Sequence, residues 1–494
     1  MPDFRSLKEG YHKDPDYPQR THDLLALARV LDGKLYYELK NPFSDEKKEN
    51  GEYIPLKDRR PAVRTRFCLT VVNDSVSMLF SEGHFPDIDC KDEQTRTSLA
   101  MVIKEACLNA VMTEAATRGS VGSICVLMRV LQARVFFTVM QTPYLTPEWD
   151  PKAPDTLQKV VERYKVKGSV LKAAGYTIKD DDLDSEFWFQ RVWDDTFESW
   201  YLPQSKADAK EGKPPALDTR RTVKHSLGFV PMVWVKNLPC GDNDCDGAPT
   251  FPAEAIDTQI EADYLLSQGG RGLKYQSDPT LLIKEPAFSE SGPAVVKGAA
   301  NAIVTGAEGD AKLLEINGTA AAAVMDWVKA LREVALEGMG GNRSNADKLS
   351  AAQSGRAMEL MNQSLIWLAD KLRISYGEGA LLELLFMIVR ASDKIALKDK
   401  RGRPIGKMSQ EEDISLRWPK WYPPTYADNA TQATTLNELR GGGLISQETA
   451  IKSIADTYDI EDVTKELAAI KSDPPPPNSA AAKPLKPALT DSQD

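Results

Sequence analysis

The pattern of apolar and polar positions is most regular between Thr319 and Asp393, where it predicts two helices joined by a glycine-rich loop. In the first helix, apolar residues recur at spacings of three and four, so they lie on one face. These residues are Val324, Trp327, Val328, Leu331, Val334 and Ala335. Because an apolar face has to be covered, we expect it to pack within the chain or between copies of it.

Glycines mark the end of the first helix and an irregularity in the second. The sequence Gly-Met-Gly-Gly-Asn at 338–342 ends the first helix, and a polar loop follows it. The second helix should begin near Ser350. Gly377 and Gly379 should kink or interrupt it before the apolar pattern continues.

The N-terminal half of the chain predicts a mixture of helices and strands. Apolar periodicity indicates helices at 67–80 and 95–118, whereas prolines between Pro143 and Pro154 indicate a loop. Segments rich in β-branched and aromatic residues predict strands at 123–130, 133–140, 187–193, 197–202 and 228–235. A helical layer followed by antiparallel strands makes residues 60–240 an α+β unit.

A further helix at 251–272 leads into a segment of different character. Residues 275–318 are punctuated by three prolines and predict short strands at 280–283 and 302–305. They carry 3 Lys or Arg residues and 6 Asp or Glu residues, so we expect a small acidic module between two helices.

The rest of the chain predicts one strand, two helices and a tail. The strand lies at 413–418, and the helices lie at 428–440 and 446–471. Proline and alanine dominate from Ser472 onward, so we expect this tail to be disordered.

Composition excludes several classes of protein. Apolar residues make up 42% of the 494 residues, which is enough for a sizeable core. The net charge of −10 argues against tight binding of nucleic acid through phosphate neutralisation. Since there is no apolar run of about 20 residues and no signal-peptide pattern at the N-terminus, we expect no membrane association. The six cysteines are too sparse for a disulfide framework and should be reduced, buried thiols.

Residues suited to catalysis are scarce. None of the four histidines is paired at metal-ligand spacing. One motif does suit a metal: Asp242, Asp244 and Asp246, followed by Gly247, match the opening of a calcium-binding loop. A loop of this kind ends in a carboxylate that also binds the calcium ion, and here that position, 253, is Ala. A solvated acidic turn explains the same residues, and both interpretations stay open.

Four short stretches are informative together with the order of these elements: Leu227–Pro231, Ser354–Glu359, Asp413–Trp418 and Leu444–Thr449. In this order and spacing they resemble the phage portal protein family. Portal proteins form the ring through which the DNA of tailed phages enters and leaves the capsid. The resemblance covers residues 60–471 of the chain.

The resemblance implies an α+β subunit that is divided into the regions of a portal protein. These are an N-terminal wing (1–250), a first stem helix (251–274), a clip (275–318), a second stem helix (319–340), a tunnel loop (341–350), a long wing helix (351–393), a wing return strand (394–425), crown-side helices (426–471) and a tail (472–494). The residues implied to line the DNA channel at the tunnel loop are Gly340, Gly341, Asn342, Arg343 and Lys348.

The resemblance also implies a function without enzymatic activity and without a required cofactor. The protein would be assembled in the cytoplasm of a bacterial host and would occupy one vertex of the virion capsid. Its first partner would be itself, in a dodecameric ring. Its other partners would be the terminase large subunit, a head-completion adaptor protein, the major capsid and scaffold proteins, and double-stranded DNA that passes through without sequence-specific contacts.

A function of a different class also fits part of the sequence. A metal-dependent enzyme acting on DNA or nucleotides could use the carboxylates of Asp242, Asp244 and Asp246 with a metal ion. Metal-dependent activity on DNA would favour the enzyme, whereas a large ring with a central hole would favour the portal protein. An ordinary helical scaffold would leave the predicted strands unexplained.

Overall fold

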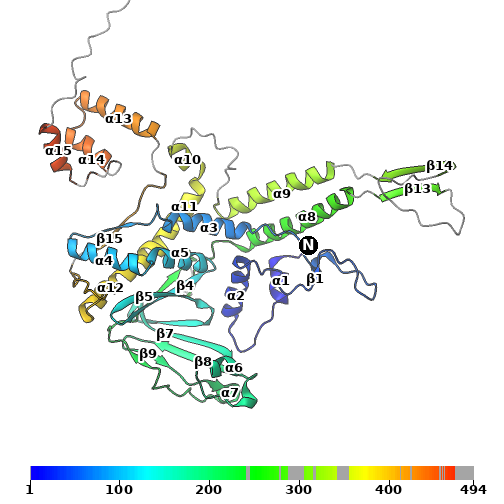
Figure 1. Cartoon of the computed structure of the whole chain (residues 1–494), viewed down its shortest axis with the longest axis horizontal. Coiled ribbons are helices and arrows are strands. Elements are labelled where there is room, and N and C mark those ends of the chain that lie inside the picture. The colour runs from blue at the N-terminus through cyan, green and yellow to red at the C-terminus, as the bar shows by residue number, and fades with distance from the viewer. Residues whose placement is uncertain are drawn as a thin grey trace, which may run out of the picture. The chain divides into compact units, whose positions relative to one another are not determined.

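The computed structural model describes residues 2–240, 245–277, 280–286, 305–314, 319–341, 355–411, 413–422, 426–455, 458, 460 and 462–472. The chain divides into two compact units (Figure 1). The first comprises Met1–Ser350 and Glu359–Trp421, and the second comprises Ala351–Met358 and Tyr422–Asp494.

Several predicted features lie outside the described residues. They are Asp242 and Asp244 of the calcium motif, Asn342, Arg343 and Lys348 of the tunnel loop, and the tail from 473 onward. The start of the second helix at Ser350 also falls outside them.

The first unit has the predicted α+β fold. Its N-terminal helices are α1 (Phe4–Gly10), α2 (Gln19–Leu31), α3 (Phe67–Phe80), α4 (Glu93–Glu105) and α5 (Leu108–Gly119). The helix predicted at 67–80 is confirmed as α3, which packs against α2, α5, α8, α9 and α11. The single helix predicted at 95–118 is wrong, because α4 and α5 are separate. Cys107 has a φ of 51°, a left-handed conformation that cannot continue a right-handed helix.

A three-stranded antiparallel sheet follows α5, in the order β12-β4-β5. The strands are β4 (Ser123–Leu131), β5 (Arg134–Gln141) and β12 (Met232–Lys236). The predicted hairpin is confirmed, with Ile124 opposite Gln141 and Leu131 opposite Arg134. Gln132 and Ala133 connect the strands with positive φ angles of 50° and 61°, as tight hairpin turns require.

A larger antiparallel sheet has the order β11-β9-β8-β7-β6, and β10 also pairs with β8. Its strands are β6 (Leu145–Asp150), β7 (Ala153–Lys167), β8 (Glu186–Trp193), β9 (Phe197–Trp200), β10 (Gln204–Ser205) and β11 (Val223–Lys224). The loop predicted from Pro143 to Pro154 is wrong, because most of it is β6 and the start of β7. Pro147 of β6 pairs with Val160 of β7, and a proline is tolerated there because β6 lies at the sheet edge.

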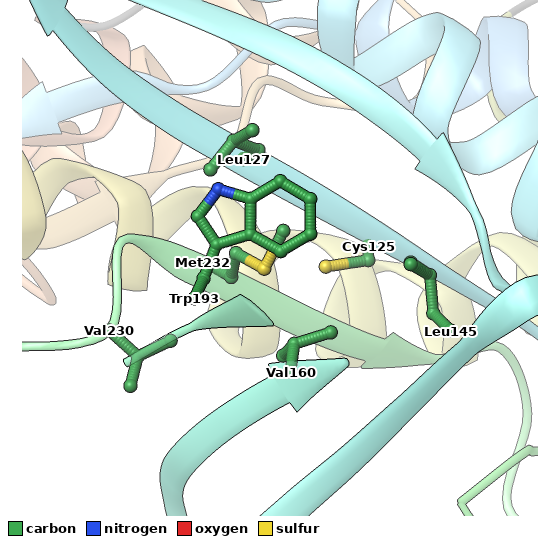
Figure 2. Packing of buried hydrophobic residues seen from close by; sticks show 7 residues of the cluster. All are labelled: Cys125, Leu127, Leu145, Val160, Trp193, Val230 and Met232. Carbon is green, nitrogen blue, oxygen red and sulfur yellow. The ribbon is translucent and has the colours of Figure 1, made fainter. Parts of the chain in front are cut away.

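The two sheets share a hydrophobic core around Trp193, which has no exposed surface (Figure 2). The cluster consists of Cys125, Leu127, Leu145, Val160, Trp193, Val230 and Met232. Burial raises the pKa of the Cys125 thiol, so this cysteine stays protonated. All six cysteines are thiols outside any disulfide, as expected, but Cys107 and Cys240 are exposed and Cys245 is half-buried, which corrects the expectation of burial for these three.

A pair of long helices follows the sheets. The helices are α8 (Ala253–Ser277) and α9 (Thr319–Gly338), and between them lie β13 (Thr280–Pro286) and β14 (Thr305–Leu314). The predictions of a helix at 251–272, a strand at 280–283 and a helix from Thr319 are confirmed. Of the strand predicted at 302–305, Thr305 lies in β14, and the three positions before it lie outside the described residues.

The second predicted helix is interrupted where its glycines lie. It consists of α10 (Gly355–Met361), α11 (Gln363–Leu372), the π-helix η5 (Arg373–Leu381) and α12 (Leu382–Lys394). A Cβ on Gly377 would lie 2.5 Å from the Trp418 ring, so the glycine lets the chain beyond β15 (Ser415–Arg417) pack there. The Arg373 guanidinium lies 3.2 Å from the centre of the Trp421 ring, and burial lowers its pKa to about 10.

Short elements complete the first unit. They are β1 (Asn41–Pro42), η1 (Leu56–Asp58), β2 (Arg59–Arg60), β3 (Asp87–Asp89), η2 (Thr142–Tyr144), α6 (Gly168–Ala173), η3 (Asp180–Asp182) and α7 (Lys206–Lys210). β1 pairs with β2, and β3 pairs with β15, which confirms the strand predicted at 413–418.

The second unit is helical. Its helices beyond Tyr422 are α13 (Tyr426–Gly441), α14 (Gln447–Ile454) and α15 (Val463–Ser472). The helix predicted at 428–440 is confirmed, but the single helix predicted at 446–471 is wrong, because α14 ends and α15 begins inside it. Asp462 explains the new start, since its carboxylate accepts hydrogen bonds from the amides of Thr464 and Lys465, as helix-capping residues do.

Candidate functional site: the paired helices and their hairpin

The candidate site is built on α8 and α9, which lie side by side and run antiparallel (Figure 1). The β13–β14 hairpin connects the end of α8 to the start of α9. The pair continues into the core of the first unit, where α8 buries Ile256, Ile260 and Tyr264 completely. Among the described residues, no helix is long and apolar enough to cross a membrane.

Gly269 sets the spacing between the two helices. A Cβ at this position would lie 2.9 Å from Cγ1 of Val324, which is closer than side-chain carbons normally approach. Gly270 and Gly272, by contrast, have no atom within 4 Å of such a Cβ. The backbone of α8 therefore approaches α9 closely at Gly269 only because this residue has no side chain.

The predicted apolar stripe of α9 divides into two groups. Val328 and Ala335 are buried, Val324 contacts Gly269, and Leu331 is half-buried. Trp327 is 56% exposed and Val334 is 59% exposed, so the described part of the chain does not cover them. Burial of the Trp327 side chain within the subunit is therefore not seen among the described residues. Its packing between copies stays a prediction.

The glycines at the end of α9 have local structural roles. Gly340 has a φ of 69°, and the amide of Gly341 donates to the carbonyl of Leu336 at 2.7 Å, which closes the helix. Gly341 is buried, and a Cβ there would lie 2.7 Å from Val71 of α3. These two residues are fixed at the base of α9, whereas Asn342, Arg343 and Lys348 lie beyond the described part of the chain.

A buried carboxylate holds the base of α8 to the N-terminal segment. Asp263 accepts hydrogen bonds from Tyr36 at 2.8 Å and from the amide and hydroxyl of Thr65 at 2.6 and 2.8 Å. Burial raises the pKa of Asp263, and these hydrogen bonds oppose the rise. The anchor fixes α8 near its middle, and the β13–β14 hairpin follows its C-terminal end.

The candidate metal motif has a different local chemistry from the one predicted. Nε and Nη2 of Arg20 donate to the two Asp246 oxygens at 2.5 and 2.8 Å, and Ser123 also donates to this carboxylate. Nη1 of Arg20 donates to the carbonyl oxygens of Thr142 and Leu145. Asp246 therefore connects α2 to the sheets, and sequence reasoning missed its partner Arg20.

This arrangement bears on the calcium and enzyme hypotheses. Both Asp246 oxygens are already occupied by a cationic side chain, so Asp246 is a poor third ligand for a cation. Within the described ranges, no group of three or more His, Cys, Asp or Glu residues could hold a metal ion. Calcium binding through Asp242 and Asp244 stays a prediction about residues outside those ranges.

Comparison with known proteins identifies the family of the chain. The model of a family described as "Phage portal protein, SPP1 Gp6-like" matches residues 18–473. The chain belongs to the phage portal protein family. A search of curated proteins gives no match. The resemblance carried by the sequence stretches is therefore confirmed at the level of the family. Proteins of this family are structural proteins of the capsid vertex rather than enzymes.

Proposed function

We propose that this portal protein forms a ring-shaped channel at one capsid vertex, through which double-stranded DNA is packaged and ejected. The observation that carries the proposal is the antiparallel α8–α9 pair, which ends in a hairpin and leaves Trp327 and Val334 exposed. In a ring, a neighbouring copy would cover these apolar side chains through a heterologous, closing contact. We propose a dodecamer, as in the portal rings that the sequence resembles.

The charge of the chain supports a channel that lets DNA pass. Residues 319–393 carry 8 Lys or Arg residues and 9 Asp or Glu residues, so they provide no basic groove. Since phosphate neutralisation dominates affinity for DNA, a near-neutral wall avoids tight binding. The loop after Gly340 and Gly341, with Asn342, Arg343 and Lys348, would then contact phosphates transiently and without reading sequence.

The β13–β14 hairpin is the proposed docking platform. It lies at the end of the helix pair that is remote from the buried base of α8 (Figure 1). We propose that this clip binds the terminase large subunit during packaging and the head-completion adaptor protein afterwards. The wing would contact the major capsid and scaffold proteins.

Imaging of the purified full-length protein tests the proposed function. Negative-stain electron microscopy and mass photometry should show closed rings with a central hole. Particles that stay monomeric at micromolar concentration would contradict the proposal. Metal-dependent cleavage of DNA or of nucleotides by the same preparation would favour the alternative enzyme that uses Asp242, Asp244 and Asp246.

A further inference from the structure

A cleft of about 340 Å³ lies on one face of the larger sheet, away from the α8–α9 pair. Aromatic and basic side chains line it, which is unusual in a chain with a net charge of −10. The aromatic and basic members are Tyr17, Tyr144, Trp188, Arg20, Arg163, Lys206 and Lys210, and Asp16 is an acidic member. Arg20 pairs with Asp246 and Lys206 with Glu186, which leaves Arg163 and Lys210 as the cations to consider. The cleft therefore provides local positive charge on an acidic subunit.

Arg163 is the side chain in the cleft best placed to bind an anion. Its guanidinium lies 4.6 Å from the centre of the Trp188 ring. In the described part of the chain it forms no ion pair, and the same holds for Lys210. An arginine stacked on an aromatic ring keeps its N–H groups available for a carboxylate, which it can bind through two parallel hydrogen bonds.

The aromatic rings themselves are already engaged. Lys165 lies 5.2 Å from the Trp188 ring centre, and Tyr17 meets that ring edge-on at 5.5 Å. Lys165 is satisfied by Asp14 and Asp16, at 2.6 and 2.5 Å. Because Arg163 also stacks on Trp188, the cleft presents cations rather than a free ring for a nucleic-acid base to stack on. These contacts favour an acidic peptide segment over a nucleotide.

A surplus of negative charge lies beside the end of β7, where the amide of Ser169 donates to the carbonyl of Leu183 at 2.8 Å. Side chains alternate along β7, so Tyr164 lies on the face opposite Arg163, where it packs with Leu171 and Tyr176. The segment that covers this face continues into an acidic turn, which we define as residues 180–184. Asp180 of the turn pairs with Lys172. Within the described residues, the carboxylates of the other three acidic members form no ion pair; they are Asp181, Asp182 and Asp184.

We propose that the cleft of each subunit binds the acidic turn of the next subunit in the ring. The proposal rests on the proposed function, because it needs a ring. A contact that closes a ring joins two different surfaces of the same chain. Here the two surfaces have opposite charge and belong to different segments of the chain, so each subunit can give its acidic turn to one neighbour and receive that of the other.

Charge reversal of each surface tests this contact. The cleft variant carries Arg163→Glu and Lys210→Glu, and the turn variant carries Asp181→Lys and Asp184→Lys. Each variant alone places like charges together at every interface, so we expect the dissociation constant per interface to rise roughly threefold to tenfold at low salt. An equimolar mixture can alternate the two variants around the ring. Every contact in the mixture is then attractive, and rings should form again with both chains present.

Mass photometry of rings over a salt series measures these outcomes, and thermal unfolding checks that each subunit is folded. A control variant, Lys57→Glu with Lys152→Glu, changes the net charge as much as the cleft variant and should assemble as the wild type does. Normal rings from either single variant would overturn the proposal, and so would a weakened cleft variant that the turn variant fails to rescue. Wild-type protein without rings would instead refute the proposed function.

Discussion

At the scale of the residue, the contact between Arg20 and Asp246 shows what a sequence pattern leaves out. The two positions are 226 residues apart, so no local pattern connects them. The spacing of Asp242, Asp244 and Asp246 predicts oxygen ligands for a cation, and the cation that Asp246 binds is the Arg20 guanidinium. Residue types can therefore be predicted from the chain, whereas a partner brought in by the tertiary fold cannot.

We expect the contact between Arg20 and Asp246 to stabilise the folded subunit. Asp246→Asn removes the counter-ion of Arg20, whose side chain is 25% exposed, and should lower the free energy of unfolding by about 2–4 kcal/mol. Chemical denaturation measures the loss. The exposed pair of Lys48 and Glu52 is the control, since Glu52→Gln should cost less than about 1 kcal/mol. An Asp246→Asn variant as stable as the wild type would mean that Arg20 needs no counter-ion.

At the scale of the element, helices with a strong apolar period could be predicted, and breaks set by single residues could not. The pattern identified α3, α8 and α9 because one face of each is buried. It missed the left-handed Cys107 between α4 and α5, because apolar residues continue on both sides of it. It also missed β6, where proline is allowed because the strand lies at an edge of the sheet.

The glycines of α8 give a matched pair of substitutions. Gly270→Ala should stabilise the subunit by about 0.5–1 kcal/mol, because alanine favours a helix and a Cβ there has free space. Gly269→Ala should lose this gain, since its Cβ would push against Val324 and separate α8 from α9. Thermal unfolding of the two variants under identical conditions compares them. A Gly269→Ala variant as stable as Gly270→Ala would show that the helices do not depend on this close approach.

At the scale of the whole molecule, some apolar side chains of α9 are buried within the subunit and others stay exposed for a contact between subunits to cover. Periodicity predicts Trp327, Val328 and Ala335 as equivalent members of an apolar face. The fold buries Val328 and Ala335 but leaves Trp327 56% exposed. A sequence pattern reports that a side chain has to be covered, and it does not report whether the same chain or a second copy covers it.

Replacement of Trp327 by glutamate tests whether a second copy covers this side chain. The exposed side chain contributes little to the isolated subunit, so Trp327→Glu should change its free energy of unfolding by less than about 1 kcal/mol. In a ring the same change would remove an aromatic anchor and bury a charge, at a cost of about 2 kcal/mol or more per interface, which weakens each contact roughly thirtyfold. Ring yield in mass photometry should therefore collapse while the melting temperature of the monomer stays unchanged. Ala322→Glu adds the same charge at an exposed position of α9 outside the stripe and should assemble normally. Intact rings from Trp327→Glu would show that no neighbouring subunit covers this face of α9.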